Sequence, residues 1–134
     1  MKWLDEITIP REQPDVPPAT VQLLQGDLSA IPRDHAVDLL IVSAFPDSYT
    51  PNPGTLFESL YRRGLDLREL ARAKSVDERA HLGCWLSRSL PPPLVQRFHF
   101  RRILCFEPRF PAFVERVNSR ELGISGQVGQ VFRC

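Results

Sequence analysis

The run of apolar residues from Val37 to Ala44 constrains the fold more than any other stretch of the sequence. It reads VDLLIVSA and hardly alternates between apolar and polar residues. A run of this length, rich in leucine and β-branched residues, is typical of a strand that is covered on both faces. The sequence therefore predicts an α/β fold in which a sheet lies between helices.

Another apolar run, Val21–Gln25, also ends in polar residues. Gly26-Asp27 follows it, and the longer run closes on Ser43-Ala44-Phe45-Pro46-Asp47. Ligands of open α/β sheets gather outside the carboxyl ends of the strands. If the two strands are parallel, both polar ends lie at that edge of the sheet. This edge is where the sequence points to a function.

Length and charge limit the classes of protein to consider. A chain of 134 residues predicts a single domain over 1–134, and its 17 basic and 16 acidic side chains give no basic footprint for nucleic acid or a membrane surface. No apolar run reaches the roughly 18 residues of a membrane span. The opening residues MKWLDEITIP carry acids where a signal peptide has its apolar core. We expect a cytoplasmic protein without nucleic-acid or membrane partners.

The prolines and the cysteines add two further expectations. Residues 10–20 hold several of the 13 prolines, which fix φ and remove a donor, so this stretch is predicted to be a connector. The three cysteines and three histidines show no metal-ligand spacing. We expect reduced thiols, no metal site and no cofactor.

The remaining pattern predicts the other elements. Strands are expected at Lys2–Ile9, Val21–Gln25, Val37–Ala44, Gly83–Leu90 and Phe98–Phe106. A short turn of helix is expected at Leu28–Pro32, a helix from Thr55 to Gly64, and a second helix that Asp66 caps. Ser75–His81 is predicted to be a polar bridge. In the strand Gly83–Leu90, Cys84 and Leu86 share one face, and Trp85 is expected in the core.

The last part of the chain bears on whether the domain is complete. A helix is predicted to begin at Ala112–Val117, and the spacing of Val128, Val131 and Phe132 predicts the opening turns of another within Gly123–Cys134. A helix that has only begun to present an apolar face should continue, so we expect a domain that is incomplete at its C-terminus. The alternative is a short natural C-terminal helix. An incomplete sheet would leave Val21–Gln25 with an open edge, so self-association is expected.

The order of elements resembles the first two-thirds of a macro domain, over roughly residues 20–107. Gly26-Asp27-Leu28 is similar to the family's Gly-Asp-Ile, and Asp38–Pro46 is similar to its Asp-Ala-Ile-Val-Asn-Ala-Ala-Asn. Thr50–Gly54 is loosely similar to its glycine-rich loop. The resemblance implies a mixed sheet flanked by helices in a three-layer α/β/α arrangement. It also implies binding of ADP-ribose or a related nucleotide, and some family members hydrolyse ADP-ribosyl esters.

The chain departs from the family at the pocket. The family's two asparagines fall on Ser43 and on Pro46 or Asp47, and Pro51-Asn52-Pro53-Gly54 replaces the glycine run. Prolines remove the backbone donors that a phosphate needs. The resemblance therefore implies a remodelled pocket.

The ligand-binding residues that the resemblance implies are Asp27, Leu28, Ser43, Asp47, Asn52, Gly54 and Thr55. Asp27 would accept a hydrogen bond from an exocyclic amine of a base, or it caps the turn that follows. Ser43 would bind a ribose hydroxyl or ends a strand, and Asp47 is a candidate general base or forms an Asx-turn. Thr55 sits where a helix opens, a natural anion site, or is only the N-cap.

Three functions follow from these residues. The first is a nucleotide-binding or sensing module of the ADP-ribose type. The second is a non-catalytic protein-interaction domain that has lost the ligand. The third is an ADP-ribosyl hydrolase in which Asp47 orients water, and the proline-stiffened loop favours the second over this third function.

Overall fold

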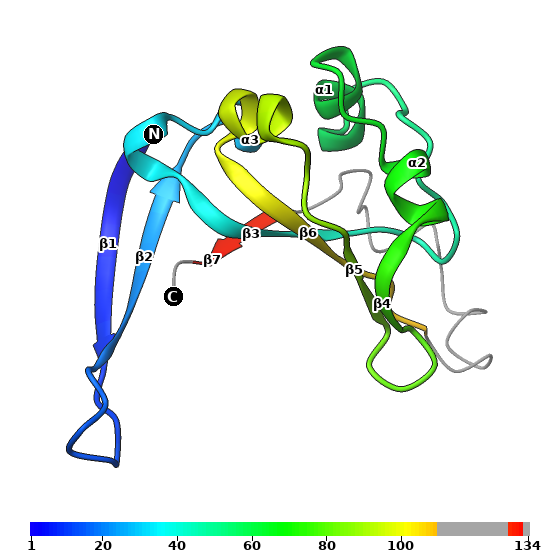
Figure 1. Cartoon of the computed structure of the whole chain (residues 1–134). Helices are drawn as coiled ribbons and strands as arrows, with labels where there is room; N and C mark the ends of the chain where they lie inside the picture. Colours follow the sequence, from blue (N-terminus) through cyan, green and yellow to red (C-terminus); the bar gives the residue numbers. More distant parts are fainter. Residues whose placement is uncertain (110–128, 133–134) are drawn as a thin grey trace, which may run out of the picture.

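The computed structural model describes residues 1–109 and the backbone of residues 129–132. Within them the chain has a mixed α/β fold with two separate sheets (Figure 1). The strands are β1 (Lys2–Ile9), β2 (Ala19–Gln25), β3 (Val37–Ser43), β4 (Lys74–Glu78), β5 (Cys84–Ser87), β6 (Phe100–Phe106) and β7 (Gly129–Phe132). The helices are α1 (Leu56–Arg62), α2 (Leu67–Arg72) and α3 (Pro92–Phe98), and short 3-10 turns form at η1 (Leu28–Ala30) and η2 (Arg33–His35).

The larger sheet has five strands in the order β4-β5-β6-β3-β7. β3 and β6 run parallel, from Val37 opposite Phe100 to Ser43 opposite Phe106. The other neighbouring pairs are antiparallel. The predicted mixed sheet and the strand predicted at Val37–Ala44 are confirmed.

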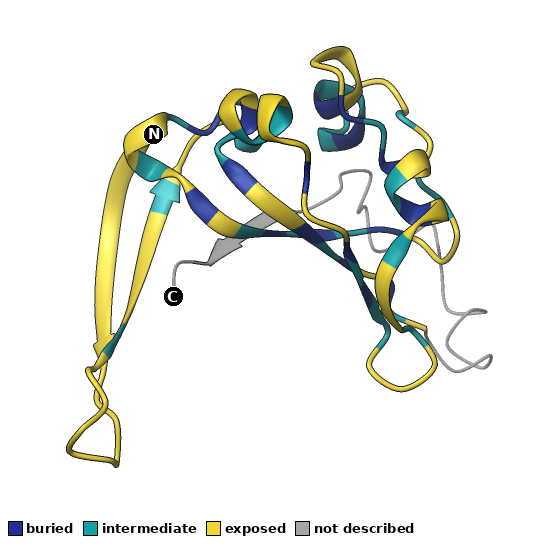
Figure 2. Ribbon diagram, viewed as in Figure 1, coloured by how far each residue is buried: buried dark blue, intermediate teal, exposed yellow. Residues whose placement is uncertain are grey.

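The side chains of β3 show how this sheet is covered. Leu40 and Val42 are at most 1% exposed, whereas Leu39 and Ile41 on the other face are half-buried. The fully buried face packs against helices that lie on one side of the sheet (Figures 1 and 2). A second helical layer, as a three-layer arrangement needs, is not among the elements of residues 1–109 and 129–132. In the same residues no helix has the length and hydropathy that a membrane crossing requires.

The smaller sheet is a hairpin of β1 and β2, which pair only with each other. Both strands were expected, and the proline-rich connector lies between them. β2 does not join β3 in one sheet, so the expectation that Gly26-Asp27 and the end of β3 share an edge of parallel strands is wrong. The hairpin extends away from the larger sheet and its helices (Figure 1).

Two helices begin and end as their sequences predict. Thr55 caps α1, since its Oγ1 accepts a hydrogen bond from the Glu58 N–H at 3.2 Å. Gly64 ends that helix with a φ of +97°, which favours glycine. Asp66 caps α2 by accepting from the Arg68 N–H at 2.9 Å. The buried side chains of each helix face the core at helical spacing. In α1 these side chains are Phe57 and Leu60.

Other predictions are wrong. Ser75–His81 is not a polar bridge, because β4 covers most of it as an edge strand whose side chains face solvent. Pro91–Pro93 does not only end a strand: Pro92 begins α3, since its fixed φ suits the first helical position. In β5, by contrast, Cys84 and Leu86 share one face as predicted, and the buried face carries Trp85 and Ser87. Trp85 is 1% exposed, so its placement in the core is confirmed.

The predicted helix within Gly123–Cys134 is also wrong where it can be compared, because Gly129–Phe132 forms β7. The backbone of β7 pairs antiparallel with Leu39–Val42 of β3. The rest of that prediction, and the helix expected at Ala112–Val117, lie outside the described residues.

Candidate functional site

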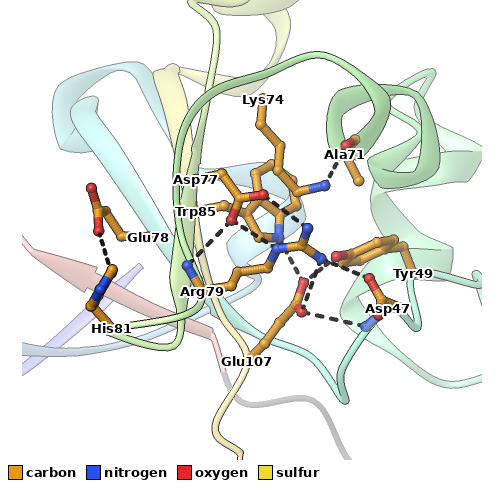
Figure 3. A network of polar contacts seen from close by, with 10 residues as sticks. All are labelled: Asp47, Tyr49, Ala71, Lys74, Asp77, Glu78, Arg79, His81, Trp85 and Glu107. Carbon is orange, nitrogen blue, oxygen red and sulfur yellow. Dashed lines mark hydrogen bonds and ion pairs between the residues drawn. The ribbon is translucent and has the colours of Figure 1, made fainter.

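The carboxyl ends of β3 and β6 are the first place to look for a ligand. The two strands are parallel neighbours, so Ser43 and Phe106 end side by side and the loops after them meet. The loop after β3 carries Asp47 and Tyr49, and Glu107 follows β6 directly. This edge holds a group of polar side chains that we call the Glu107 cluster: Asp47, Tyr49, Arg79, Trp85 and Glu107 (Figure 3).

Glu107 lies at the centre of the cluster with no exposed surface. Its Oε1 accepts hydrogen bonds from the Trp85 indole Nε1–H, at 2.7 Å, and from the Tyr49 hydroxyl. Its Oε2 accepts from the Asp47 backbone N–H at 3.3 Å. A buried carboxylate is stable only when its oxygens have such donors, and here the donors come from two separate segments, β5 and the loop after β3.

Arg79 supplies the positive charge beside this carboxylate. Its Nη1 lies 3.8 Å from Glu107 Oε2 and 2.7 Å from Asp47 Oδ1. Its Nε donates to Asp77 Oδ1 at 2.8 Å. The hydrogen bond from Arg79 lowers the pKa of Asp77 to about 2. The guanidinium is therefore shared among three carboxylates.

The aromatic rings of the cluster hold a second cation. Tyr49 and Trp85 meet edge to face with centroids 5.7 Å apart, and Lys74 Nζ lies 5.2 Å from the Trp85 ring centroid. Lys74 also donates to the Ala71 carbonyl at 2.5 Å. Burial, and then the hydrogen bond to Glu107, raise the pKa of Tyr49.

These contacts limit the chemistry that the cluster can perform. Burial raises the pKa of the neighbouring Cys105 to about 12, so this thiol stays protonated and is a poor nucleophile. Glu107 is surrounded by donors and out of reach of solvent. In the described part of the chain, no three acidic, histidine or cysteine side chains are grouped as a metal site would need. The arrangement ties the loop after β3 to β4, β5 and β6.

The structure separates the predicted ligand-binding residues into three places. Asp27 and Leu28 lie at η1, which packs beside α1, and Asp27 Oδ1 accepts from the Ser29 N–H at 2.8 Å. The prediction that Asp27 caps this turn is confirmed. Ser43 ends β3, and Asp47 belongs to the Glu107 cluster.

Asp47 has a φ of +56°, which acidic and amide residues tolerate better than others. The turn around it closes through a hydrogen bond from the Ser48 N–H to the Phe45 carbonyl, at 3.0 Å. Its carboxylate binds Arg79 across the site, so the residue links the loop to β4 through the guanidinium.

Asn52, Gly54 and Thr55 form the third place, at the start of α1. Glu58 of the same helix fills this end, because its Oε2 accepts from the Gly54 N–H at 2.7 Å. The backbone donors that would attract a phosphate thus face a carboxylate already. Thr55 is the N-cap of α1, which was the alternative to an anion site in the sequence analysis.

Sequence reasoning missed Glu107 and Arg79 altogether, and gave Trp85 and Tyr49 no shared role. The available signal was the position of Glu107, one residue beyond a buried strand that is parallel to β3. Its partners lie between 22 and 60 residues away along the chain, and no local pattern joins them.

Two hollows flank the body. One, of about 290 Å³, lies beside the cluster against Asp77, Arg79, Ala80 and Arg109. The other, of about 960 Å³, lies near the amino ends of β3 and β6. Its walls include arginines and aspartates, with Arg101 and Asp38 paired at 3.3 Å. Neither has the aromatic and aliphatic lining that is usual for an organic ligand.

The β1–β2 hairpin has a different character, because it exposes an apolar surface. Ile7 pairs with Val21, and Ile9 and Leu23 lie on the same face by the alternation of the strands, while the charged Asp5 opposite Leu23 ends the apolar stretch. The four apolar residues Ile7, Val21, Ile9 and Leu23, which we call the apolar hairpin face, are 62%, 38%, 48% and 58% exposed in that order. Figure 2 shows the hairpin exposed along most of its length.

The opposite face of the hairpin is polar. It carries Glu6, Thr8, Thr20 and Gln22, with Leu24 and its partner Trp3 at one end, and the Gln22 Nε2 donates to Glu6 Oε2 at 2.7 Å. Such alternation is typical of a sheet with one face in water and one face covered. Within the described residues the apolar face is left uncovered.

No protein-family model matches the chain, no curated protein matches its sequence, and no solved structure matches its fold.

Proposed function

We propose that the chain is a non-catalytic protein-interaction module, and that it binds another polypeptide through the apolar hairpin face. The observation that carries the proposal is the exposure of an amphipathic hairpin whose apolar residues are regularly placed. Monomeric proteins rarely leave a contiguous apolar surface of this kind without a use. An isolated two-stranded hairpin is also marginal in water, so a partner would stabilise it.

The free energy available from this face indicates what the partner must provide. Complete burial of an aliphatic side chain is worth about 1.5–3 kcal/mol, so four half-exposed ones offer roughly 4 kcal/mol. Association costs about 4–15 kcal/mol in lost freedom. The face alone gives little net affinity, and a partner must add contacts, such as backbone hydrogen bonds along an open strand edge.

The Glu107 cluster supports the absence of catalysis. Its buried carboxylate is held by internal donors, its phenol and the nearby thiol have raised pKa values, and its arginine is shared among carboxylates. Groups arranged in this way stabilise one another and are not poised to attack a substrate.

The test uses a photo-crosslinking amino acid at Ile7, with the neighbouring Thr8 on the polar face as the matched control. We expect one protein to be captured from position 7 and not from position 8. That protein, once purified, should bind the chain saturably, and Ile7→Thr should weaken binding at least tenfold. Equal capture from both positions, or a captured protein whose affinity Ile7→Thr leaves unchanged, would overturn the proposal.

A macro-like nucleotide-binding module is the second candidate. It is favoured by the parallel pairing of β3 with β6, which brings Ser43 and Asp47 to the carboxyl edge beside the hollow that Arg79 and Arg109 line. Two guanidinium groups suit a pyrophosphate. Calorimetric titration of ADP-ribose tests it: micromolar binding that Arg109→Ala weakens tenfold would support this candidate. If the folded chain gives no binding heat with ADP-ribose, this candidate function is excluded.

A further inference from the structure

We infer that the hairpin also joins a second copy of this chain, by antiparallel pairing of β2 with β2 across a twofold axis. The inference goes beyond the proposed function, because it uses the open edge of β2 and leaves the apolar hairpin face free for another polypeptide. Self-association through the open edge of Val21–Gln25 was expected from the sequence, and the inference adds a register.

The two edges of the hairpin differ in charge. β1 carries Lys2, Asp5 and Glu6, whereas β2 reads ATVQLLQ and has no charged residue. Charges on an edge strand oppose the addition of another strand, and an uncharged edge lacks this protection. Within the described residues, β2 pairs with β1 alone, so its outer edge is open to another strand.

The sequence of β2 is complementary to itself at its centre when it is read antiparallel, whereas its ends form the mixed pairs Thr20–Leu24 and Ala19–Gln25. Its seven residues overlap fully when the middle residue, Gln22, lies on the twofold axis opposite Gln22 of the second copy. Val21 then lies opposite Leu23 on the apolar face, and the two glutamines meet on the polar face. Other registers keep fewer pairs, so this one is preferred.

The result is a continuous four-stranded sheet in the order β1-β2-β2-β1. Four strands are enough for an independent sheet, which two are not. The apolar hairpin faces of both copies lie on the same side, because a twofold axis perpendicular to the sheet preserves its faces. The dimer therefore presents an apolar surface twice as wide as that of one chain.

The main experiment measures the dimer dissociation constant by sedimentation equilibrium. Gln22→Lys places two lysines opposite each other at the axis, and we expect it to weaken the dimer at least tenfold at low salt, with partial recovery at high salt. Thr8→Lys puts the same charge on the same polar face but on the outer strand, and it should leave the constant unchanged. Circular dichroism of each variant checks the fold. The Gln22→Lys side chain can still bind the Glu6 carboxylate, as Gln22 does.

Mixing the variants sharpens the test. Gln22→Lys mixed with Gln22→Glu should form heterodimers more tightly than either variant forms homodimers, because opposite charges then meet at the axis. Gln22→Cys should form an intermolecular disulfide that peptide mapping locates, since Cα atoms directly opposite each other lie about 4.5–5.5 Å apart, within the range of a disulfide. Thr8→Cys should not form one.

The outcomes separate this inference from the proposed function. A chain that stays monomeric at 100 times the concentration used for crosslinking, or a dimer that Gln22→Lys does not weaken, would overturn the β2 pairing. Crosslinking from Ile7 to a different protein would then leave the proposed function standing. If the chain neither forms this dimer nor crosslinks from Ile7 to another protein, both the inference and the proposed function are wrong.

Discussion

The Glu107 cluster and the β1–β2 hairpin both depart from the rule that charges face water and aliphatic side chains face the core, and they do so in opposite directions. Glu107 is a carboxylate without exposed surface, and Ile7 is an aliphatic side chain that is 62% exposed. Glu107 has its donors inside the chain, on Trp85, Tyr49 and Asp47. The apolar hairpin face has no such complement among the described residues.

This difference indicates how each region contributes to the protein. The Glu107 cluster is complete, so changes there should alter the free energy of unfolding. The hairpin is incomplete, so changes there should alter association and leave unfolding of the dilute chain nearly unchanged. The predictions below test this division.

The largest effect is expected from Glu107→Ala. The substitution leaves the Trp85 indole and the Tyr49 hydroxyl without their acceptor in a buried place and removes the ion pair with Arg79, and we expect a loss of about 3–5 kcal/mol in the free energy of unfolding. Urea denaturation at pH 7 measures it. Glu107→Gln keeps an acceptor oxygen and most of the volume, so it should lose less. A loss below about 1 kcal/mol in Glu107→Ala would show that the Glu107 cluster does not stabilise the carboxyl ends of β3 and β6.

Tyr49→Phe should have the next largest effect. It removes one donor to the buried carboxylate and keeps the ring that packs on Trp85, so the expected loss is about 1.5–3 kcal/mol. The same urea experiment measures it. Tyr61→Phe is the control, because Tyr61 is 49% exposed on α1. Equal losses in the two variants would contradict the role given to Tyr49.

Alkaline pH should destabilise the fold through Cys105. Burial raises its pKa from 9.0 to about 12, so above pH 9 the unfolded chain loses this proton first. Stability from the neutral thiol is therefore complete below pH 9 and is lost progressively between pH 9 and 12. Urea midpoints across this range should fall less steeply in Cys105→Ala than in the unmodified chain. Identical slopes would show that Cys105 does not titrate in this way.

The smallest effect on stability is expected from Ile7→Thr. The side chain is exposed in the single chain, so its removal should change the free energy of unfolding by less than about 0.5 kcal/mol at low concentration. Leu40→Ala, in the fully buried face of β3, should lose about 2–5 kcal/mol in the same measurement. If Ile7→Thr were as destabilising as Leu40→Ala, the hairpin face would be covered by the chain itself.

The elements that the sequence predicted correctly depend on local information. The unbroken run VDLLIVS made β3 recognisable, and Thr55 and Asp66 mark helix starts because each caps through a contact two or three residues away. The signal for the start of α3 was local too. Its prolines also suit the end of a strand, however, and the pattern alone does not decide between a strand end and a helix start.

The parts that the sequence did not predict depend on distant partners. β7 was taken for a helix because its pairing with β3 spans most of the chain. Glu107 was missed because its burial depends on donors that β5 and the loop after β3 supply. The strands β1 and β2 were expected, but nothing local shows that they form a sheet of their own.

Hydrogen exchange of the backbone amides at several protein concentrations tests the central claim most directly, namely that the complement of the hairpin lies outside the single chain. We predict that amides of β3 and β6 are protected at every concentration, whereas those of β1 and β2 exchange quickly in dilute solution and gain protection as concentration rises or a partner is added. Protection of β1 and β2 equal to that of β3 in the most dilute sample would contradict the account.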